Sequence, residues 1–443
     1  MRIFKSIYID YKSLDLGNRL FLIGVFFLPS ALPISGLFLL ISLILSFKNK
    51  NYISLKDKWN LPLFMSIGII FFSTINISFI DKPLILSTYN ISTIWINLIN
   101  WLPLFIYFWG FQNYLISNKQ KVIFAQSLVS GTFPVILSIV LHKYFNLYGP
   151  YKTFYGLIIW FQKTIPNDGG PASGLFSNPN YTAIWLGLVL PFAIILLIRS
   201  KNFSFEKYIL IILCFLIIFM ILLTASRNGI LGIFITFFCI YGLRKFLIFF
   251  TSLISIFSLS RLIGFLVNRN ITFHDSILPR SLIGKLSELS EFGFYKTSPR
   301  LDIWQSALAR IQERPFWGWG SSTFSFLNKN NSSTFNVPLL PVKAEHSHNL
   351  TIELAHNFGI PLSLILMTTI LLFFLISWKF IFFTIPFDKD LLLKKAFFTS
   401  SLIAFISHLN DITLYDGKVS IIISILFAGL KTIINNKKEY QSL

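Results

Sequence analysis

The sequence has little charge for its length. Only 13% of its 443 residues are Asp, Glu, Lys or Arg, whereas 54% are hydrophobic, and the mean hydropathy is +0.68. Soluble globular domains are about 25% charged, because their surfaces must be hydrated. The shortage of charge therefore excludes an ordinary water-soluble domain.

Cysteine is also scarce. The chain has two, Cys214 and Cys239, and neither stands in a CxxC or CxxH spacing. This excludes a disulfide framework and a cysteine-based metal site. Both residues fall within apolar runs, where we interpret them as small packing side chains.

Long apolar runs take the place of charge. They extend over roughly 15 to 25 residues, about the length that a helix needs to cross a bilayer core. We predict an all-α, polytopic integral membrane protein with about 12 transmembrane helices. No cleavable signal peptide is expected, since the first residues are polar and basic and no small-residue site follows. The predicted spans are 19–31, 33–47, 61–80, 93–116, 121–141, 178–198, 207–224, 228–243, 246–267, 349–378, 391–408 and 419–434.

The formal net charge of +20 agrees with one orientation of these spans. If the N-terminus is cytoplasmic, the basic residues fall mainly in cytoplasmic loops, as the positive-inside rule requires. Both termini are then predicted to be cytoplasmic. Because topology accounts for the charge, we expect no nucleic-acid partner. The basic loops are 48–60, 117–121, 199–206, 244–245, 379–390 and the C-terminal tail.

Two long hydrophilic segments, 142–177 and 268–348, then lie on the outer face. In the second, Ser298 is a suitable helix cap, Pro299 suits the first helical position, and Pro315 follows the end. We expect an amphipathic helix that lies against the membrane surface or the helical bundle. Its predicted apolar stripe consists of Leu301, Trp304, Leu308 and Ile311.

Two arginines stand at predicted helix starts on the outer side. Arg227 is either a cation that reaches out from the end of a span or part of an anion site, because helix starts attract anions. Arg300 opposes the dipole of the loop helix, which favours a contact with ligand over a role in stabilising the helix. Arg310 and Arg314, at the other end of that helix, suit the dipole and are interpreted as structural.

Three of the six histidines occur in "AEHSHNLTIELAHNFGIP", residues 344–361. They are His346, His348 and His356. If a helix begins near Asn349, His356 lies roughly 12 Å along it. That is too far for one tetrahedral site, so no metal is predicted. A single histidine that acts as a general base is chemically easier, and polar residues at a helix mouth are the plain alternative.

Together these residues suit the transfer of a group from a phosphorylated donor. Two permanent cations suit a pyrophosphate, and a neutral imidazole suits the activation of a hydroxyl. The sequence has no Walker-type glycine loop or carboxylate cluster for a nucleotide. The energy for any transfer would therefore lie in the donor itself.

Four patches resemble the O-antigen ligase and polymerase family, integral inner-membrane enzymes of bacterial surface-glycan assembly. The most specific is the last, in which His348, Asn349, nine residues and Gly359 match the ligase pattern of His, then Asn, Ser or Gln, nine residues, and Gly. The resemblance covers about 170–435. The patches are "GLFSNPNYTAIWLGLVLP" (174–191), "TASRNGILG" (224–232), "SPRLDIWQSALARIQERPFWGWGSSTF" (298–324) and "HSHNLTIELAHNFGIPLSL" (346–364).

The resemblance implies two regions in the chain. The segment 1–170 would hold N-terminal transmembrane helices. The segment 171–435 would be an O-antigen ligase-like membrane domain, with the amphipathic helix in a large periplasmic loop, 268–348.

The resemblance also implies the reaction: a glycosyltransferase of the bacterial inner membrane that needs no metal or other cofactor. The donor would be a glycan on an undecaprenyl-pyrophosphate carrier, and the acceptor a hydroxyl of lipid A–core or another glycan, at the periplasmic face among membrane lipids. Arg227 and Arg300 match the arginines that hold the pyrophosphate, and His348 matches the proposed base of an inverting displacement. Possible pocket residues are His346, Asn349 and Asn180.

Two other functions stay open. An O-antigen polymerase would act on lipid-linked repeat units with the same pyrophosphate site, but polymerases often have arginine-rich outer loops, and 142–177 contains no arginine. A transporter of bicarbonate or another small anion would need polar residues deep within the spans. The spans are nearly free of them, with Arg261 as the main exception. The sequence therefore favours the ligase.

Overall fold

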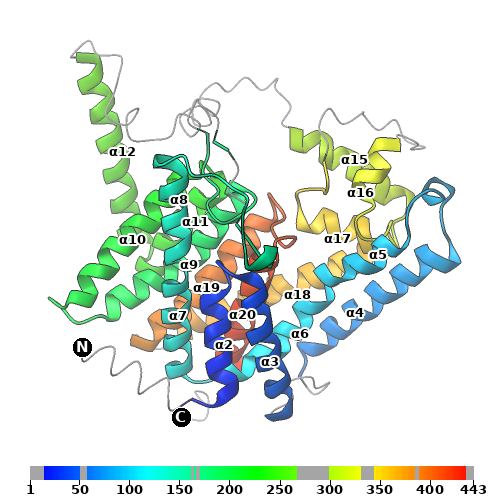
Figure 1. Ribbon diagram of the computed structural model, residues 1–443, viewed down its shortest axis with the longest axis horizontal. Coiled ribbons are helices and arrows are strands. Elements are labelled where there is room, and N and C mark those ends of the chain that lie inside the picture. Colours follow the sequence, from blue (N-terminus) through cyan, green and yellow to red (C-terminus); the bar gives the residue numbers. More distant parts are fainter. Residues whose placement is uncertain are drawn as a thin grey trace.

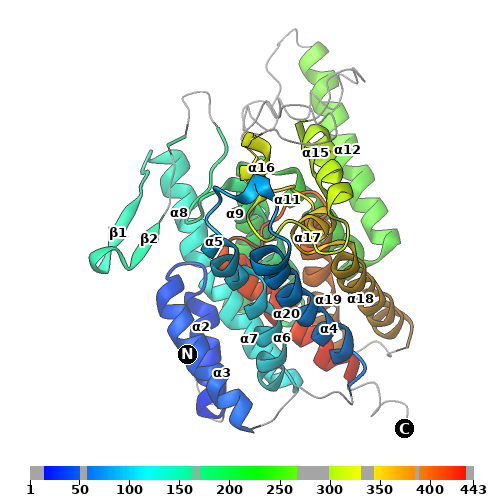
Figure 2. The same ribbon diagram turned by 90° about the vertical axis from the view of Figure 1, so that its right-hand side faces the viewer.

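The computed structural model describes residues 14–49, 57–160, 164–165, 170–266, 299–330, 344–384 and 389–435. These residues form a bundle of packed helices (Figure 1). A short antiparallel hairpin, β1 (Tyr151–Thr153) and β2 (Ile158–Trp160), projects beside it (Figure 2). The predicted all-α class is confirmed.

Eight helical segments of the described residues are long and apolar enough to cross a membrane. The protein is therefore a polytopic membrane protein, but the predicted count of twelve spans is not confirmed. Three further apolar helices are shorter: Leu16–Phe27, Leu32–Lys48 and Arg227–Tyr241. The eight segments are Asn60–Ile80, Ser92–Tyr114, Asn118–Tyr144, Pro179–Arg199, Phe205–Leu223, Ile360–Phe383, Asp390–His408 and Gly417–Asn435.

The first two helices, α2 (Leu16–Phe27) and α3 (Leu32–Asn49), form a hairpin. The hydroxyl of Ser35 on α3 donates to the backbone oxygen of Gly24 on α2 at 2.7 Å. The following elements are α4 (Asn60–Ile75), η1 (Asn76–Ile80), η2 (Leu84–Leu86), α5 (Ser92–Ile96), η3 (Asn97–Asn100), α6 (Leu102–Gly110), η4 (Phe111–Tyr114), α7 (Asn118–Gly131), α8 (Phe133–Tyr144) and η5 (Phe154–Gly156).

Three helices, α9 (Pro179–Arg199), α19 (Lys389–His408) and α20 (Gly417–Asn435), form the centre of the bundle. In their most apolar stretches 78%, 78% and 89% of the residues are buried, compared with 33% in α10 (Phe205–Leu223) and 28% in Ile360–Phe383. One apolar core joins these central helices to the N-terminal ones. The division of the chain at residue 170 stays a prediction.

Small residues let α11 (Arg227–Tyr241) approach α9 closely. A side chain on Gly229 would lie 2.9 Å from Cβ of Ala183, and one on Gly232 would lie 3.9 Å from Cα of Gly187. Because lipid tails are as apolar as the side chains, membrane helices associate largely through such close packing. The contact brings the start of α11 beside the start of α9. The helix α12 (Leu243–Leu266) follows α11.

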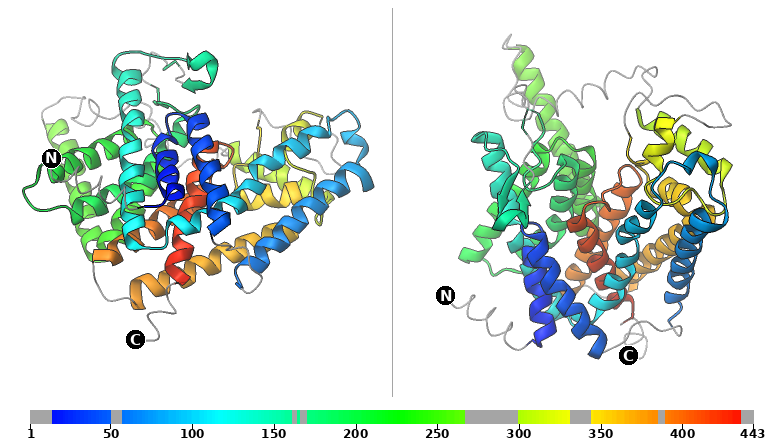
Figure 3. Two further views of the ribbon diagram at one scale, coloured as in Figure 1. Left: turned by 60° about the horizontal axis from the view of Figure 1, so that its bottom comes forward. Right: turned by 45° about the vertical axis from the view of Figure 1, so that its right-hand side comes forward.

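Short helices form a layer at one end of the bundle, while α2 begins and α20 ends at the other (Figures 1 and 3). These short helices are α15 (Pro299–Glu313), α16 (Phe324–Asn330) and α17 (Leu350–Phe358). The rest of the predicted outer loop, 268–298 and 331–343, lies outside the described residues.

The predicted span 349–378 is in fact two helices, α17 and α18 (Ile360–Lys379), followed by η6 (Phe380–Thr384). They are separated by Gly359, whose φ is +96° and whose missing side chain would lie 2.0 Å from the backbone oxygen of Phe316. Only glycine tolerates this conformation and this close approach. The break leaves α17 in the layer of short helices, where it packs against α15.

The structure confirms the predicted loop helix as α15, which begins at Pro299; the predicted cap, Ser298, lies outside the described residues. The predicted apolar stripe is partly wrong. Leu301 and Leu308 are 47% and 49% exposed, whereas Ile303 and Ala307 are buried.

Polar contacts explain which face of α15 is buried. The hydroxyl of Ser306 donates to Asn328 at 2.8 Å, and the guanidinium of Arg310 donates to the backbone oxygen of Leu327 at 3.1 Å. These contacts hold α15 on α16 by its polar as well as its apolar residues, so the hydrophobic pattern alone could not identify the face.

Candidate functional site

Three helix starts meet at the polar turn between α19 and α20, residues 409–416. The side chain of Asn349, which caps α17, donates to a backbone oxygen of this turn at 2.9 Å. Asn180, in the first turn of α9, donates to a carboxylate of the turn at 2.8 Å. Asn228, in the first turn of α11, donates to a backbone oxygen near the end of α19 at 3.5 Å. Helix starts carry free N–H groups and partial positive charge, so this arrangement favours an anion.

His348 and Asp411 form a hydrogen-bonded pair at this turn. Nδ1 of His348 lies 2.8 Å from Oδ1 of Asp411, and the two side chains are 30% and 6% exposed. The second carboxylate oxygen of Asp411 accepts from Asn180, which fixes its orientation. A carboxylate at Nδ1 favours the tautomer in which Nε2 keeps its lone pair. Nε2 is then the atom that can accept a proton from a substrate.

Ser347, the residue before His348, is held by hydrogen bonds from side chains to both its backbone N–H and its backbone carbonyl. The N–H of Ser347 donates to Oε2 of Glu353 on α17 at 2.9 Å, and its carbonyl accepts from the indole of Trp304 on α15 at 3.0 Å. His348 itself has a φ of 55°, a left-handed conformation that is costly for a residue with a side chain. Strained residues of this kind are often found at functional sites, where the surroundings hold them in place.

A buried polar chain supports this loop from the other side. The ring of His346 lies 4.2 Å from that of His348 and stacks on Tyr415 at 5.3 Å. The hydroxyl of Tyr415 donates to Oε1 of Glu353 at 2.5 Å, and the same oxygen accepts from Asn357 at 3.1 Å. Glu353 therefore connects the two histidines to α17 and to the 409–416 turn.

The charge states of these groups follow from their surroundings. Burial alone would raise the pKa of Asp411, but the hydrogen bond and charge of His348 and the charge of Arg300 hold it below 3.8. Burial, together with neighbouring His348, lowers the pKa of His346 below 6.5. Burial would raise the pKa of Glu353, but His356 and the hydrogen bond from Tyr415 outweigh it and keep the pKa below 4.5. At neutral pH both carboxylates are therefore charged, and His346 is neutral.

The structure places the two predicted arginines at the starts of two helices, α15 and α11. Arg300 is half-buried in the first turn of α15, close enough for its charge to lower the pKa of Asp411. Arg227 is exposed and is the first residue of α11, directly after Ser226 and the left-handed Ala225 (φ 49°). The contact of its neighbour Asn228 with the end of α19 sets α11 against the same turn.

The remaining predicted residues are also accounted for. His346, Asn349 and Asn180 lie in the network around the turn, as the contacts above show. His356 is fully buried and packs edge-on against Phe324. Arg310 and Arg314 contact the ring of Trp319 from 5.8 and 5.6 Å, a structural environment.

Sequence reasoning missed Asp411, Glu353 and Tyr415. A signal for Asp411 and Tyr415 was present: "SHLNDITLYDGK" is a polar stretch between two apolar spans on the same predicted face. Nothing in the sequence indicated that Asp411 pairs with a histidine 63 residues away. Glu353 was visible only as a carboxylate near the histidines.

The described residues contain no group of three His, Cys, Asp or Glu side chains arranged to hold a metal ion. Positive charge near the turn comes instead from helix starts and from arginine. Such groups can bind a phosphate without a metal.

Comparison with protein-family models gives a match that begins near the middle of the chain. Residues 212–367 match a family model described as O-antigen ligase. The matched region runs from α10 into α18 and includes Arg227, Arg300, His346, His348 and Asn349, but not Asn180 or Asp411. It confirms the resemblance and is shorter than the 170–435 expected from the sequence patches. No curated protein matches the chain.

Proposed function

We propose that this protein is a ligase that acts on a lipid-linked glycan. Its residues 212–367 match the family model described as O-antigen ligase. The match supports a glycosyltransferase of the O-antigen ligase or polymerase type. In the proposed reaction, a glycan moves from an undecaprenyl-pyrophosphate carrier to a hydroxyl of lipid A–core or another glycan. The reaction takes place at the periplasmic face of the bacterial inner membrane, with both ends of the chain in the cytoplasm.

The observation that carries this proposal is the His348–Asp411 pair at 2.8 Å. Asp411 holds the imidazole so that Nε2 can remove the proton of the acceptor hydroxyl. The oxygen then attacks the anomeric carbon as the bond to pyrophosphate breaks, and the carbon is inverted. Asp411 stays ionised, because its pKa lies below 3.8, and it stabilises the imidazolium that forms.

The leaving group takes up negative charge as its bond breaks. Arg227 and Arg300 stabilise this charge, since a planar guanidinium can bind two phosphate oxygens at once. The starts of α9 and α11 add N–H groups that favour the same charge. In this scheme arginine does the work that a metal ion does in many other phosphate sites, so no metal or other cofactor is required.

The ligase is favoured over the polymerase by one observation: the outer segment 142–177 contains no arginine. In either enzyme the same base and the same arginines would serve, so the acceptor is what separates the two.

The test is complementation of a host strain that lacks the gene, with surface polysaccharide examined by gel. The wild-type gene restores the polysaccharide, whereas His348→Ala, Arg227→Ala and Arg300→Ala do not. Arg244→Ala, an exposed arginine at the start of α12, is the matched control and restores it fully. Immunoblots establish that every variant is present in the membrane.

The same gels separate the two reactions. Loss of a ligase leaves long chains on the lipid carrier, whereas loss of a polymerase leaves single repeat units on the surface. Normal polysaccharide in the null strain, or full restoration by His348→Ala, contradicts the proposal.

A further inference from the structure

The hairpin of β1 and β2 has no part in the candidate site. Its register pairs Thr153 with Ile158, so the turn between the strands is 154–157. All of β1 is exposed, whereas the residues of β2 are buried or half-buried. In Figure 2 the hairpin projects sideways from the bundle. It therefore presents β1 and the turn to whatever lies beside the helices.

The hairpin joins the bundle where apolar helices end. It follows the helical segment Asn118–Tyr144, which is long and apolar enough to cross a membrane. Its second strand is held by the indole of Trp160, which donates to the backbone oxygen of Ser30 at 2.7 Å, in the turn between α2 and α3. Because membrane-spanning helices end near the lipid headgroups, these two attachments place the hairpin at the height of the membrane–water interface.

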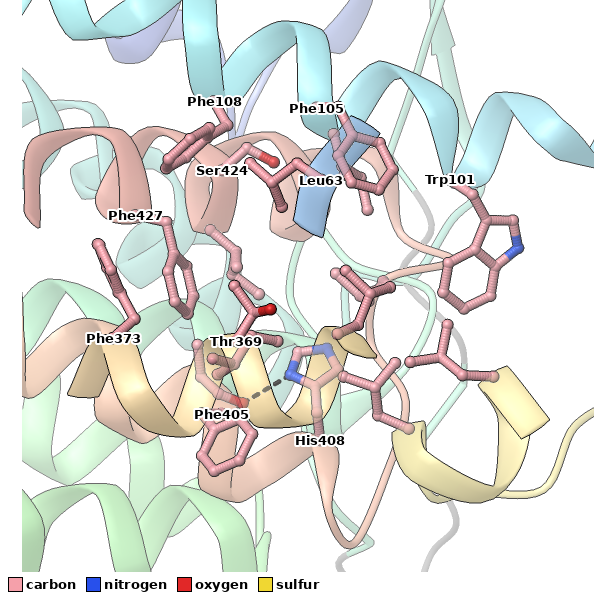
Figure 4. A pocket seen from close by; sticks show the side chains of 18 of the residues that line it. Leu63, Trp101, Phe105, Phe108, Thr369, Phe373, Phe405, His408, Ser424 and Phe427 are labelled. Carbon is pink, nitrogen blue, oxygen red and sulfur yellow. Dashed lines mark hydrogen bonds between the residues drawn. The ribbon is translucent and has the colours of Figure 1, made fainter. Parts of the chain in front are cut away.

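The exposed surface of the hairpin and of the chain that leads to it is apolar and aromatic. Phe154 is 71% exposed, and Tyr155 is fully exposed. An apolar cavity of about 190 Å³ elsewhere in the bundle has its aromatic side chains between helices, among them Phe105 and Phe427 (Figure 4). Exposed apolar patches on a protein mark contacts with another protein or with a membrane. The other exposed apolar residues of this surface are Phe145, Leu147, Tyr148, Tyr151 and Leu157.

The backbone of the turn holds its two aromatic residues in a costly conformation. Phe154 and Tyr155 have φ values of 50° and 57°, in the left-handed region. Hairpin turns with such angles usually contain Asn, Asp or Gly, because a larger side chain is strained there. Aromatic rings that are exposed at a cost in backbone energy indicate a surface with a function.

The charge of this segment suits lipid phosphates. Residues 142–166 include Lys143, Lys152 and Lys163 but no Asp or Glu. Lys152 is exposed on β1, next to the turn. Anionic headgroups attract lysines near a membrane surface, and aromatic side chains are concentrated at the same depth. Charge and aromatic content therefore favour the same partner, an anionic lipid surface.

We propose that the turn 154–157 enters the headgroup region of the bilayer, on the side of the bundle where α8 ends. The side chains of Phe154, Tyr155 and Leu157 lie against the first carbons of the acyl chains, and Lys152 contacts a lipid phosphate. A sugar chain is less suited to this surface, because Phe154 and Leu157 offer it no hydrogen bond. The inference depends only on the membrane-spanning helices and goes beyond the proposed function.

A fluorophore at Leu157 provides the test. Cys214→Ala and Cys239→Ala remove the native thiols, and Leu157→Cys is labelled with a dye whose emission depends on its surroundings. Lys329→Cys, at an exposed position of α16 (Figure 1), is the matched control. The protein is placed in nanodiscs of phosphatidylcholine, with or without anionic phosphatidylglycerol. Quenching by iodide in water and by nitroxide lipids in the bilayer measures the ratio of inserted to exposed label.

We expect nitroxide lipids to quench the label at Leu157 and iodide to quench the label at Lys329. Phe154→Ser combined with Tyr155→Ser should lower the inserted-to-exposed ratio about tenfold or more, as the loss of one buried aromatic side chain predicts. Lys152→Gln should lower it about fivefold with phosphatidylglycerol and leave it unchanged without.

Three results would overturn the inference. The first is equal iodide quenching of the labels at Leu157 and Lys329. The second is an unchanged ratio in the double variant of Phe154 and Tyr155. The third is protection of the Leu157 label that arises only when a glycan is added, which would assign the hairpin to a sugar chain. An effect of Lys152→Gln that is equal in both lipids would contradict its contact with a lipid phosphate.

Discussion

The two ends of the bundle both bring a carboxylate beside a basic side chain, but in different surroundings. At the end where α20 stops, Arg199 pairs with Asp390 at 3.1 Å, and Asn118 also binds this carboxylate. At the other end, His348 pairs with Asp411 at 2.8 Å. The first pair joins the end of α9 to the start of α19. The second pair lies near three helix starts, and the charge of Arg300 acts on Asp411.

The difference teaches which feature indicates function. The Arg199–Asp390 pair holds two elements together and contains no imidazole that could take up a proton, although the basic side chains of Lys121 and Lys394 lie close to it. Near His348 the charge of Arg300 acts on Asp411, and the imidazole keeps one nitrogen available. Positive charge beside a group that can take up a proton is what a pyrophosphate-leaving reaction requires.

The largest expected effect comes from replacing the basic residue of each pair. His348→Ala should lower kcat for glycan transfer by about 10³, because general base catalysis contributes roughly 10² to 10⁴. Arg199→Ala should change the rate less than about twofold, since a partly exposed pair far from the reacting groups contributes little. Initial rates in nanodiscs measure both. Comparable losses in the two variants would show that the pairs do not differ in role.

The next effect concerns the carboxylates. Asp411→Asn should lower kcat by about 10², because the imidazole loses the partner that fixes its tautomer. The KM for the donor should change little, since the arginines remain. Asp390→Asn, the matched change at the other end, should leave kcat near wild type. A rise in the donor KM of Asp411→Asn, with kcat intact, would assign Asp411 to donor binding.

A third effect is on stability. Glu353→Gln should lower the free energy of unfolding by about 2 kcal/mol, because a charged acceptor of three hydrogen bonds is lost. The folded-state pKa of Glu353 lies below 4.5, so its contribution is fully present above pH 4.5 and is lost as the pH falls through the folded value. Thermal unfolding of wild type and variant in micelles should therefore converge in acid. A gap that is constant from pH 7 to pH 4 would contradict this assignment.

The smallest expected effect tests the hydrogen bond between Trp304 and the backbone of Ser347. Trp304→Phe keeps the ring and removes the indole N–H that binds the carbonyl of Ser347, so kcat should fall about three- to fivefold, as one hydrogen bond predicts. Trp160→Phe, which removes an indole hydrogen bond to the backbone of Ser30, is the matched control and should keep full activity. A larger loss in Trp160→Phe would mean that the site depends on general packing.

Part of the site could be predicted because it depends on local sequence. His348, Asn349, nine residues and Gly359 describe one short helix: Asn349 caps α17, its nine residues follow, and Gly359 ends it. The start of α15 at Pro299 is local in the same sense. Each of these features requires only residue types at fixed spacing along the chain.

Other features depend on tertiary contacts between residues far apart in the chain, which local sequence patterns do not reveal. The partner of His348 comes from a turn 63 residues later, and Asn180 reaches the same carboxylate from 231 residues earlier. The buried face of α15 depends on polar contacts with α16 as well as on apolar residues. Hydropathy also joined α17 to α18, because the effect of Gly359 is visible only when Phe316 lies against it.

The most direct test of the account is the rate of glycan transfer by the purified protein in nanodiscs, with a lipid-linked donor and a chelator present. The account predicts that the wild type transfers glycan at the same rate with and without the chelator. His348→Ala should bind the donor with unchanged affinity and transfer almost none. Transfer by His348→Ala at the wild-type rate would contradict the assignment of the base, and loss of wild-type transfer in chelator would contradict the role given to the arginines.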